Sequence, residues 1–249
     1  MTLRQLIDAK TVTYGAWCSI PSPLIAELFG YAGFDWVCVD SQHGLVNHET
    51  LVTMLQAVDV SGRASVVRVP WNDPAAIMKA LDAGAHGVIV PMINSPEEAS
   101  RAAQACRYPP AGIRSWGLNR HGFGGPYTTE SGNLETVCAI QIETVSGLDA
   151  AKEILSVPGI DIVYVGPADL AVSAGIAPTF EVANPHHEKM ITDLLHAALD
   201  HGVVPGIHAP YPEGALRWRD AGFQFITSAT DVTYIRGGAQ ATLAALRPG

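Results

Sequence analysis

The sequence predicts an α/β protein that folds as a single-domain (β/α)8 barrel, the TIM barrel. Three observations support this prediction. Short apolar runs alternate with helical stretches, eight such runs follow one another, and 249 residues are about the length that one barrel needs. No linker rich in proline, glycine or serine divides the chain, so we expect one domain over residues 1–249. An open doubly wound sheet is the alternative, but no GxGxxG pattern follows the first strand to support it.

Each predicted strand is a short run of apolar residues. Most of the runs are continuous rather than alternating, as expected for parallel strands covered on both faces. In chain order the predicted strands are Gly15–Ser19, Trp36–Asp40, Ser65–Val69, Gly87–Pro91, Cys138–Glu143, Ile162–Gly166, Val204–Ala209 and Phe223–Ser228.

Helical stretches separate these strands. Several begin at a proline that follows a capping residue, and several end just before a glycine. Proline suits the first turn of a helix, and glycine suits the left-handed residue that closes one. The predicted helices are Pro23–Ala32, Glu49–Ser61, Pro74–Ala83, Pro96–Cys106, Gly147–Val157, His187–His201 and Gly214–Ala221.

Composition and charge argue against several classes of protein. The chain carries a formal net charge of −9 and no cluster of Lys and Arg, so we expect no nucleic-acid partner. No apolar run reaches the roughly 18 residues of a membrane span, and the first ten residues lack the apolar core of a signal peptide. The four cysteines show neither a CxxC pair nor a zinc-ligand spacing. We expect them to be reduced, which fits a cytoplasmic protein.

Polar residues gather at the carboxyl ends of the predicted strands, where barrel enzymes place their active sites. A charged side chain beside an apolar strand is costly to bury without a partner, so the gathering indicates a site. The residues are Asp40, His43, Arg68, Gln141, Glu143 and Asp169, and the remaining strand ends carry Ser19, Pro91, His208 and Ser228.

Glu143 and Asp169 follow adjacent predicted strands and can converge on one point. Two carboxylates with water and a chelating substrate suit Mg²⁺ or Mn²⁺. The alternative is a pair of solvated or helix-capping acids. Arg68 is enclosed by valines in VVRVPWND, and its guanidinium suits a keto or carboxylate oxygen. A structural ion pair is the alternative for this arginine.

Histidines provide the candidate acid–base groups. His43, in VDSQHG, follows a strand end and is our first choice, with His208 second. His186 and His187 begin a polar helix, so we expect both at the surface. The VGPADL segment opens a helix, and its free amides could hold a substrate carboxylate. An ordinary strand–turn–helix junction is the alternative there.

With these residues identified, the chain resembles the HpcH/HpaI family of metal-dependent pyruvate aldolases, which share a barrel of the phosphoenolpyruvate/pyruvate-binding type. The similarity covers nearly the whole chain. The matching segments are AGFDWVCVDSQHG, VVRVPWNDPAAI, VIVPMINSPEEA, RYPPAGIRSWG, IQIET and VGPADL. Each segment is short, but their order and spacing are specific together.

The resemblance implies which residues bind metal and substrate. Glu143 and Asp169 correspond to the metal ligands, with Mg²⁺ or Mn²⁺ expected and Co²⁺ also acceptable. Gln141 corresponds to a glutamine that contacts the substrate. The backbone amides of Ala168 and Asp169 correspond to those that hold the substrate carboxylate.

The resemblance also implies catalytic roles. Arg68 corresponds to the arginine that stabilises the developing enolate, and His43 to the acid–base histidine. Asp82, in LDAG, corresponds to an aspartate that makes this histidine more basic. Its position at a predicted helix end, at the bottom of the barrel, equally fits a helix-terminal acid. The chain departs from the family at Gln42 and Leu45, where many members read EHGP or EHAP, and in the glycine-rich stretch 119–133.

The implied reaction is that of an aldehyde-lyase of the 4-hydroxy-2-oxoheptanedioate or 2-keto-3-deoxy-sugar-acid aldolase type. The enolate of pyruvate or hydroxypyruvate, with the keto acid held on a divalent metal, adds to an aldehyde, and cleavage is the reverse. No lysine ends a predicted strand, which disfavours a Schiff-base aldolase. An acyl-CoA lyase of the citryl- or malyl-CoA type and a non-catalytic keto-acid-binding barrel are the alternatives. The resemblance further implies a homohexamer.

Overall fold

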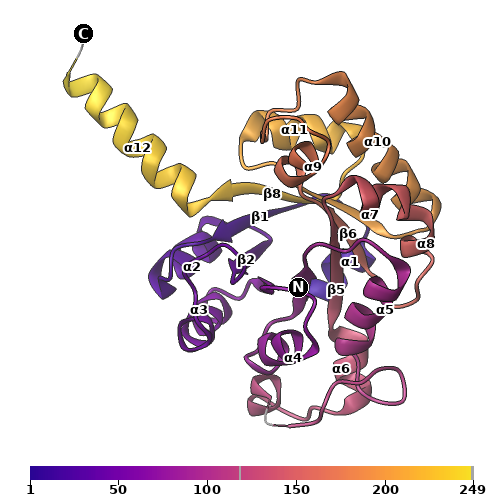
Figure 1. Ribbon diagram of the computed structural model, residues 1–249. Helices are drawn as coiled ribbons and strands as arrows, with labels where there is room; N and C mark the ends of the chain where they lie inside the picture. The colour runs from indigo at the N-terminus through magenta and orange to yellow at the C-terminus, as the bar shows by residue number, and fades with distance from the viewer. Residues whose placement is uncertain (118, 248–249) are drawn as a thin grey trace.

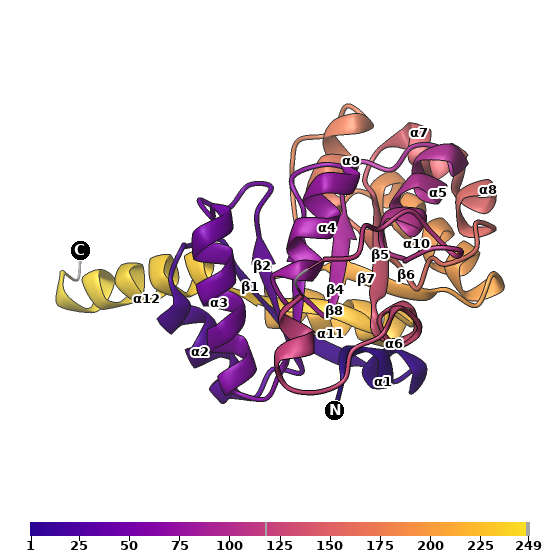
Figure 2. The same ribbon diagram turned by 90° about the horizontal axis from the view of Figure 1, so that it is seen from below.

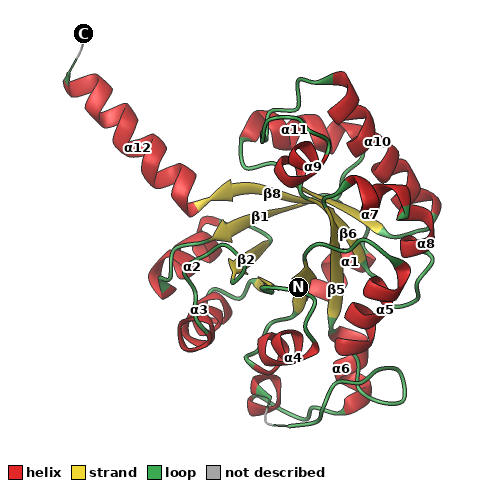
Figure 3. Ribbon diagram, in the orientation of Figure 1, coloured by secondary structure: helices red, strands yellow, loops and turns green. Residues whose placement is uncertain are grey.

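The computed structural model describes residues 1–117 and 119–247 (Figure 1). Eight parallel strands form a closed barrel in sequence order, with helices around it (Figure 3). The prediction of a (β/α)8 barrel is therefore confirmed. Leu118, Pro248 and Gly249, which the predicted domain includes, lie outside the described residues.

All strand boundaries lie within two residues of their predicted positions. The largest shift is at the last strand, because Phe223 packs edge-on against Trp218 beneath a helix instead of pairing in the sheet. The strands are β1 Thr13–Cys18, β2 Trp36–Asp40, β3 Ala64–Arg68, β4 Gly87–Val90, β5 Val137–Ile142, β6 Ile162–Val165, β7 Val204–His208 and β8 Phe225–Thr230.

The predicted helices are present, and one of them is divided at Ala150 into α7 and α8. The last helix was not predicted, because Gly237 and Gly238 interrupt its helical pattern. The helices are α1 Leu3–Asp8, α2 Pro23–Ala32, α3 His48–Val60, α4 Pro74–Asp82, α5 Pro96–Ala105, α6 Thr129–Glu135, α7 Val145–Asp149, α8 Ala151–Leu155, α9 Pro167–Ser173, α10 Pro185–Asp200, α11 Pro212–Ala221 and α12 Asp231–Leu246, with a 3-10 turn at Arg120–Phe123.

The apolar core has two parts, one between the barrel and its helices and one inside the barrel. Inside, Trp36 stacks on Phe225 with ring centroids 3.8 Å apart. A Cβ at Gly15 would collide with the Trp36 ring, so glycine is needed for this packing. Helix α1 buries Leu3 and Leu6 in the same cluster, next to the amino end of β4. The amino end of the barrel is thereby filled, which leaves the carboxyl end for a site.

Helix α12 extends away from the barrel in both Figure 1 and Figure 2. Only Asp231 is buried among its described residues, and apolar side chains such as Tyr234, Ile235 and Leu243 are about half exposed. Within residues 1–117 and 119–247, no helix combines the length and the apolar character needed to span a bilayer.

Candidate active site

A cavity of about 370 Å³ opens at the carboxyl end of the barrel. Most of the predicted site residues line it, together with parts of the chain far apart in sequence, from β1 to the first turns of α12. The predicted residues in its lining are Asp40, His43, Arg68, Gln141, Ala168, Asp169 and His208.

Glu143 follows β5 and lies directly behind this lining, with 2% of its surface exposed. Its Oε1 accepts a hydrogen bond from the Met92 backbone N–H at 3.0 Å, and its Oε2 accepts one from the Gln141 side-chain amide. Burial and then the nearby charge of Asp169 raise the pKa of Glu143 to about 7, although Met92, Arg68 and Gln141 limit the rise. Because the negative charges of Glu143 and Asp169 repel each other, the two carboxylates resist being ionised together unless a cation binds between them.

Two backbone features hold the Glu143 carboxylate. Met92 has a φ of 57°, a left-handed conformation that non-glycine residues seldom adopt, and Asn94 donates a hydrogen bond to its carbonyl. At Gly166 a Cβ would lie 2.5 Å from Glu143 Oε2 and 2.7 Å from Gln141 Nε2. The glycine of VGPADL therefore lets the backbone pass beside the carboxylate, and Met92 carries the local strain often found at functional sites.

Asp40 and Arg68 form a bidentate ion pair at the ends of β2 and β3. Arg68 Nε donates to Asp40 Oδ1 at 2.9 Å, and Arg68 Nη2 donates to Oδ2 at 2.6 Å. Burial pushes the pKa of Asp40 upward, but the Arg68 hydrogen bonds and charge lower it overall. The guanidinium lies over the ring of Trp17, 4.8 Å from its centroid. Its Nη1 has no hydrogen-bond partner in the described part of the chain, so this edge is free to meet a ligand in the cavity.

His43 lies on the loop after β2, and Asp40 also positions this loop. Asp40 Oδ1 accepts hydrogen bonds from the backbone N–H groups of Gln42 at 3.1 Å and His43 at 3.3 Å. A Cβ at Gly44 would collide with the Asp40 carbonyl oxygen, so the turn needs glycine there. One buried carboxylate thus orders both the arginine and the backbone that carries the histidine.

These residues fit a divalent cation. Glu143 and Asp169 supply two hard oxygen ligands, and Gly166 leaves space at the Glu143 carboxylate. The Gln141 Oε1 atom is buried without a hydrogen-bond partner. No group of three or more His, Cys, Asp or Glu side chains suited to a metal occurs among residues 1–117 and 119–247. A cation would therefore complete its shell with water and substrate oxygens, as Mg²⁺ and Mn²⁺ commonly do.

The family model described as HpcH/HpaI aldolase/citrate lyase matches residues 13–237. The chain belongs to this family. It is 34% identical over 240 residues to 5-keto-4-deoxy-D-glucarate aldolase of Klebsiella pneumoniae subsp. pneumoniae, covering 95% of this chain and 93% of the relative. Among solved structures, a family member from Burkholderia cenocepacia is 30% identical with a TM-score of 0.90, and 98% of each chain is covered. The citrate synthase SbnG is 28% identical with a TM-score of 0.87, covering 98% of this chain and 96% of that one.

These relatives confirm the predicted family and the predicted class, an aldolase that acts as a carbon–carbon lyase. Membership of this family also implies a divalent metal.

Asp82 of this aldolase does not lie in the cavity. It ends α4, just before β4 begins, and therefore lies at the amino end of the barrel, opposite the site. Arg114 Nη2 donates a hydrogen bond to its carboxylate at 2.8 Å. Within one chain Asp82 and His43 are not brought together, so the role of Asp82 in making His43 more basic stays a prediction.

The prediction that His187 lies at the surface of the aldolase is wrong. The side chain is fully buried, because it shares one face of α10 with Met190, Ile191 and Leu194. The spacing of three, four and seven residues marks the inward face of a helix. The sequence HH therefore combines one exposed and one buried residue.

Several residues that line the aldolase's cavity were not predicted. Trp17 lies within an apolar strand, where it looked like ordinary core, and Phe180 and Tyr211 lie on loops without a recognisable motif. Arg236 belongs to α12, which was itself not predicted. The only local signal for Trp17 was an aromatic residue one position before a strand end, and Tyr164 of β6 shows the same pattern without lining the cavity.

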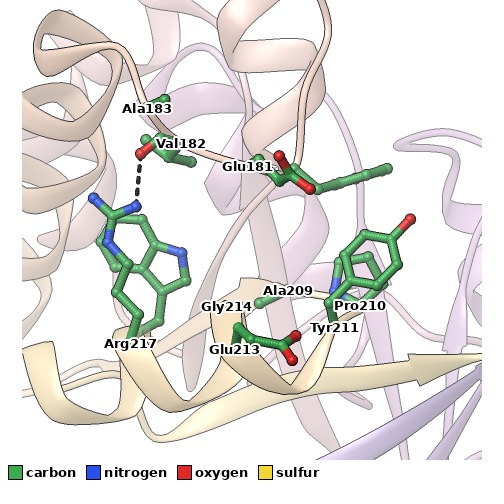
Figure 4. Close-up of a pocket in the computed structure, with 11 residues that line it drawn as sticks. Glu181, Val182, Ala183, Ala209, Pro210, Tyr211, Glu213, Gly214 and Arg217 are labelled. Carbon is green, nitrogen blue, oxygen red and sulfur yellow. Dashed lines mark hydrogen bonds between the residues drawn. The ribbon is translucent and has the colours of Figure 1, made fainter.

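A second cavity of about 500 Å³ lies beside the first and shares Phe180, Pro210 and Tyr211 with it. Figure 4 shows Arg217 hydrogen-bonded to the Val182 carbonyl oxygen on one side of it, with Tyr211 on the other. This cavity is larger, but none of the predicted metal or substrate ligands lines it. The first cavity therefore remains the candidate active site.

Proposed function

We propose that this aldolase cleaves and forms 4-hydroxy-2-keto acids through the enolate of pyruvate or hydroxypyruvate, using Mg²⁺ or Mn²⁺, or else Co²⁺. The observation that carries the proposal is the convergence of Glu143, directly behind the cavity lining, with Asp169 and the free edge of Arg68 in that lining. When bound, the cation supplies Lewis acidity toward the keto and carboxylate oxygens of the substrate. No observation specifically favours the acyl-CoA lyase alternative.

Arg68 stabilises the negative charge that develops on the keto oxygen. Because Asp40 holds Nε and Nη2, the guanidinium cannot rotate, and the free Nη1 edge faces the ligand. A donor that is already oriented costs no reorganisation as the charge forms. Gln141 and the amides of Ala168 and Asp169 hold the keto acid from the β5 and β6 side.

His43 accepts and returns the proton in this scheme. The proton leaves the carbon next to the keto group, and the carbon–carbon bond then forms between that carbon and the aldehyde carbon. The aldehyde oxygen takes up a proton to become the 4-hydroxyl group. His43 is exposed on its loop and lines the cavity, so it can exchange protons with both substrate and solvent.

The physiological substrate that we propose is a keto-deoxy sugar acid, as the names of the curated relatives suggest. If the substrate is a diacid, as the glucarate derivative in the name of these relatives is, the aldehyde released carries a hydroxyl group and a carboxylate group. Arg236 at the cavity mouth has no ion-pair partner in the described part of the chain, whereas Arg68 is neutralised by Asp40. An unpaired guanidinium suits an anionic tail.

We further propose that residues 1–249 form one cytoplasmic aldolase domain that assembles as a homohexamer. The half-exposed apolar side chains of α12 support assembly, because such surface on a projecting helix is usually covered. In an assembly Asp82 could approach His43 of a neighbouring chain, which a single chain does not permit.

Hydrogen exchange at the methyl group of pyruvate in D2O tests the proposed function. We expect exchange with Mg²⁺ or Mn²⁺ present, its loss after EDTA, and its recovery when the ion is restored. Exchange that persists unchanged after complete metal removal would contradict the proposal.

A further inference from the structure

His208 ends β7 and lines the candidate active site, but the proposed reaction gives it no role. The residues that hold the keto acid come from β3, β5 and β6. His208 instead ends β7, next to β6 in the barrel, and its neighbours are Trp17 of β1 and Phe180. With the keto acid held from β3, β5 and β6, we place the aldehyde against these residues and call this side of the cavity the aldehyde wall.

The imidazole is held from three sides. Its Nδ1 lies 3.2 Å from the Tyr164 hydroxyl, which in turn lies 2.6 Å from the Thr227 hydroxyl. Trp17 packs edge-on against the ring with centroids 4.8 Å apart, and Phe180 packs at 5.3 Å. Tyr164 and Thr227 are fully buried. The ring therefore has one defined orientation rather than several.

This orientation leaves Nε2 for the cavity. Among the described residues Nε2 has no hydrogen-bond partner. The atom is accessible rather than buried. Burial, followed by the positive charge of Arg68, lowers the pKa of His208 to about 3, and Asp40 offsets this only in part. The ring is therefore neutral at working pH, and its Nε2 is a donor or an acceptor according to the tautomer.

We propose that His208 determines specificity for the aldehyde: its Nε2 hydrogen-bonds a hydroxyl group on the carbon next to the aldehyde carbonyl. A hydroxyl group both donates and accepts, so it can complement either tautomer of a neutral imidazole. An alkyl group of the same size would cover Nε2 and leave it unsatisfied, which costs free energy. The inference rests on the proposed function, and it selects hydroxylated aldehydes as the acceptor class.

Glycolaldehyde and propanal provide a matched test, because they differ only by a hydroxyl in place of a methyl group. With pyruvate and Mg²⁺, we expect the wild-type enzyme to favour glycolaldehyde in kcat/KM. In His208→Leu this preference should fall by about 10- to 100-fold, the range for losing one buried hydrogen bond. Pyruvate exchange in D2O, measured on the same variant, should fall much less than addition to glycolaldehyde.

Two conservative variants separate contact from structure. In His208→Gln the amide can reach the position of Nε2, so part of the preference should return. In His208→Asn the amide replaces Nδ1 and keeps the Tyr164 contact, so the preference should fall as in His208→Leu. These two variants also carry the test if the leucine variant does not fold.

Three outcomes would overturn the assignment. The preference could stay unchanged, both aldehydes could lose activity equally, or pyruvate exchange could fall as much as addition to glycolaldehyde. The second outcome would place His208 at the aldehyde carbonyl, and the third at the keto acid. Failure of the proposed function is distinct from all three, because the wild-type enzyme would then show no metal-dependent exchange.

Discussion

The two walls of the active site are built in different ways. The keto-acid wall uses residues at or just after the ends of β3, β5 and β6. The aldehyde wall combines β7 and β1 with the loop residue Phe180 and Arg236 of α12. Arg68 is fixed by its ion pair with Asp40 at the end of β2. Glu143 is fixed by hydrogen bonds from Met92 and Gln141. His208 is instead fixed by aromatic packing and hydroxyl groups. The keto-acid wall therefore suits enolate formation, which needs charged groups in fixed positions. The aldehyde wall suits discrimination among aldehyde substrates.

The largest effect is expected at Glu143. Replacing Glu143 by Ala removes one of two carboxylate ligands, and we expect pyruvate exchange to fall by about 1,000-fold, since metal activation is worth several kcal/mol. Glu213→Ala is the matched control, because Glu213 is an exposed acid of the second cavity. Circular dichroism should show both variants folded. Full exchange activity in Glu143→Ala would remove this residue as a ligand.

The next effect is expected at Arg68. Arg68→Lys keeps the positive charge, but its single ammonium nitrogen on a flexible chain cannot replace a planar fork that holds Asp40 through two nitrogens and presents a third to the substrate. We expect kcat for aldol cleavage to fall by about 100-fold, the range for losing one oriented oxyanion donor. The KM for the keto acid should change less. A large rise in KM with kcat unchanged would show that Arg68 only binds the substrate.

The keto-acid wall could be predicted from sequence because each of its residues lies in a short segment at a strand end. Glu143 in IQIET, Arg68 in VVRVP and Asp169 in VGPADL can be located one strand at a time. Trp17 could not, because whether an apolar residue near a strand end faces the barrel mouth depends on register and on neighbouring strands. Arg236 could not be assigned to the site from sequence, because Gly237 and Gly238 interrupt the helical pattern of α12 and the helix was not predicted.

The third effect concerns Gly166, whose backbone passes directly beside the Glu143 carboxylate. In Gly166→Ala the added Cβ would lie 2.5 Å from Glu143 Oε2, so the carboxylate must shift. We expect metal affinity to weaken by about 10- to 100-fold, as for residues that support metal ligands. Isothermal titration with Mn²⁺ measures this. Gly214→Ala is the control, since its Cβ would have an ordinary 3.7 Å contact. Equal affinities in the two variants would show that metal binding does not need the space at Gly166.

The fourth effect is a pH dependence of the metal-free protein. Because the pKa of Glu143 rises from 4.5 to about 7 on folding, its protonated form stabilises the fold fully below pH about 4.5, and this contribution is lost as pH rises through about 7. The free energy of unfolding without metal should therefore decline across this window. Denaturation at several pH values measures the decline, and Glu143→Gln should flatten it. An equal slope in that variant would assign the decline to another group.

The smallest effect is expected at Asp82, which lies outside both walls of its own chain. If an assembled neighbour brings Asp82 to His43, Asp82→Asn removes a charge that favours the protonated imidazole. The acid limb of the pH profile of kcat/KM should then move to lower pH by roughly one unit, changing the rate a few-fold near that limb. The Arg114 ion pair is lost at the same time, so the melting temperature should also fall. A lower melting temperature with an unmoved acid limb would confine Asp82 to this ion pair, and the aspartate would then have no part in the proton transfer at His43.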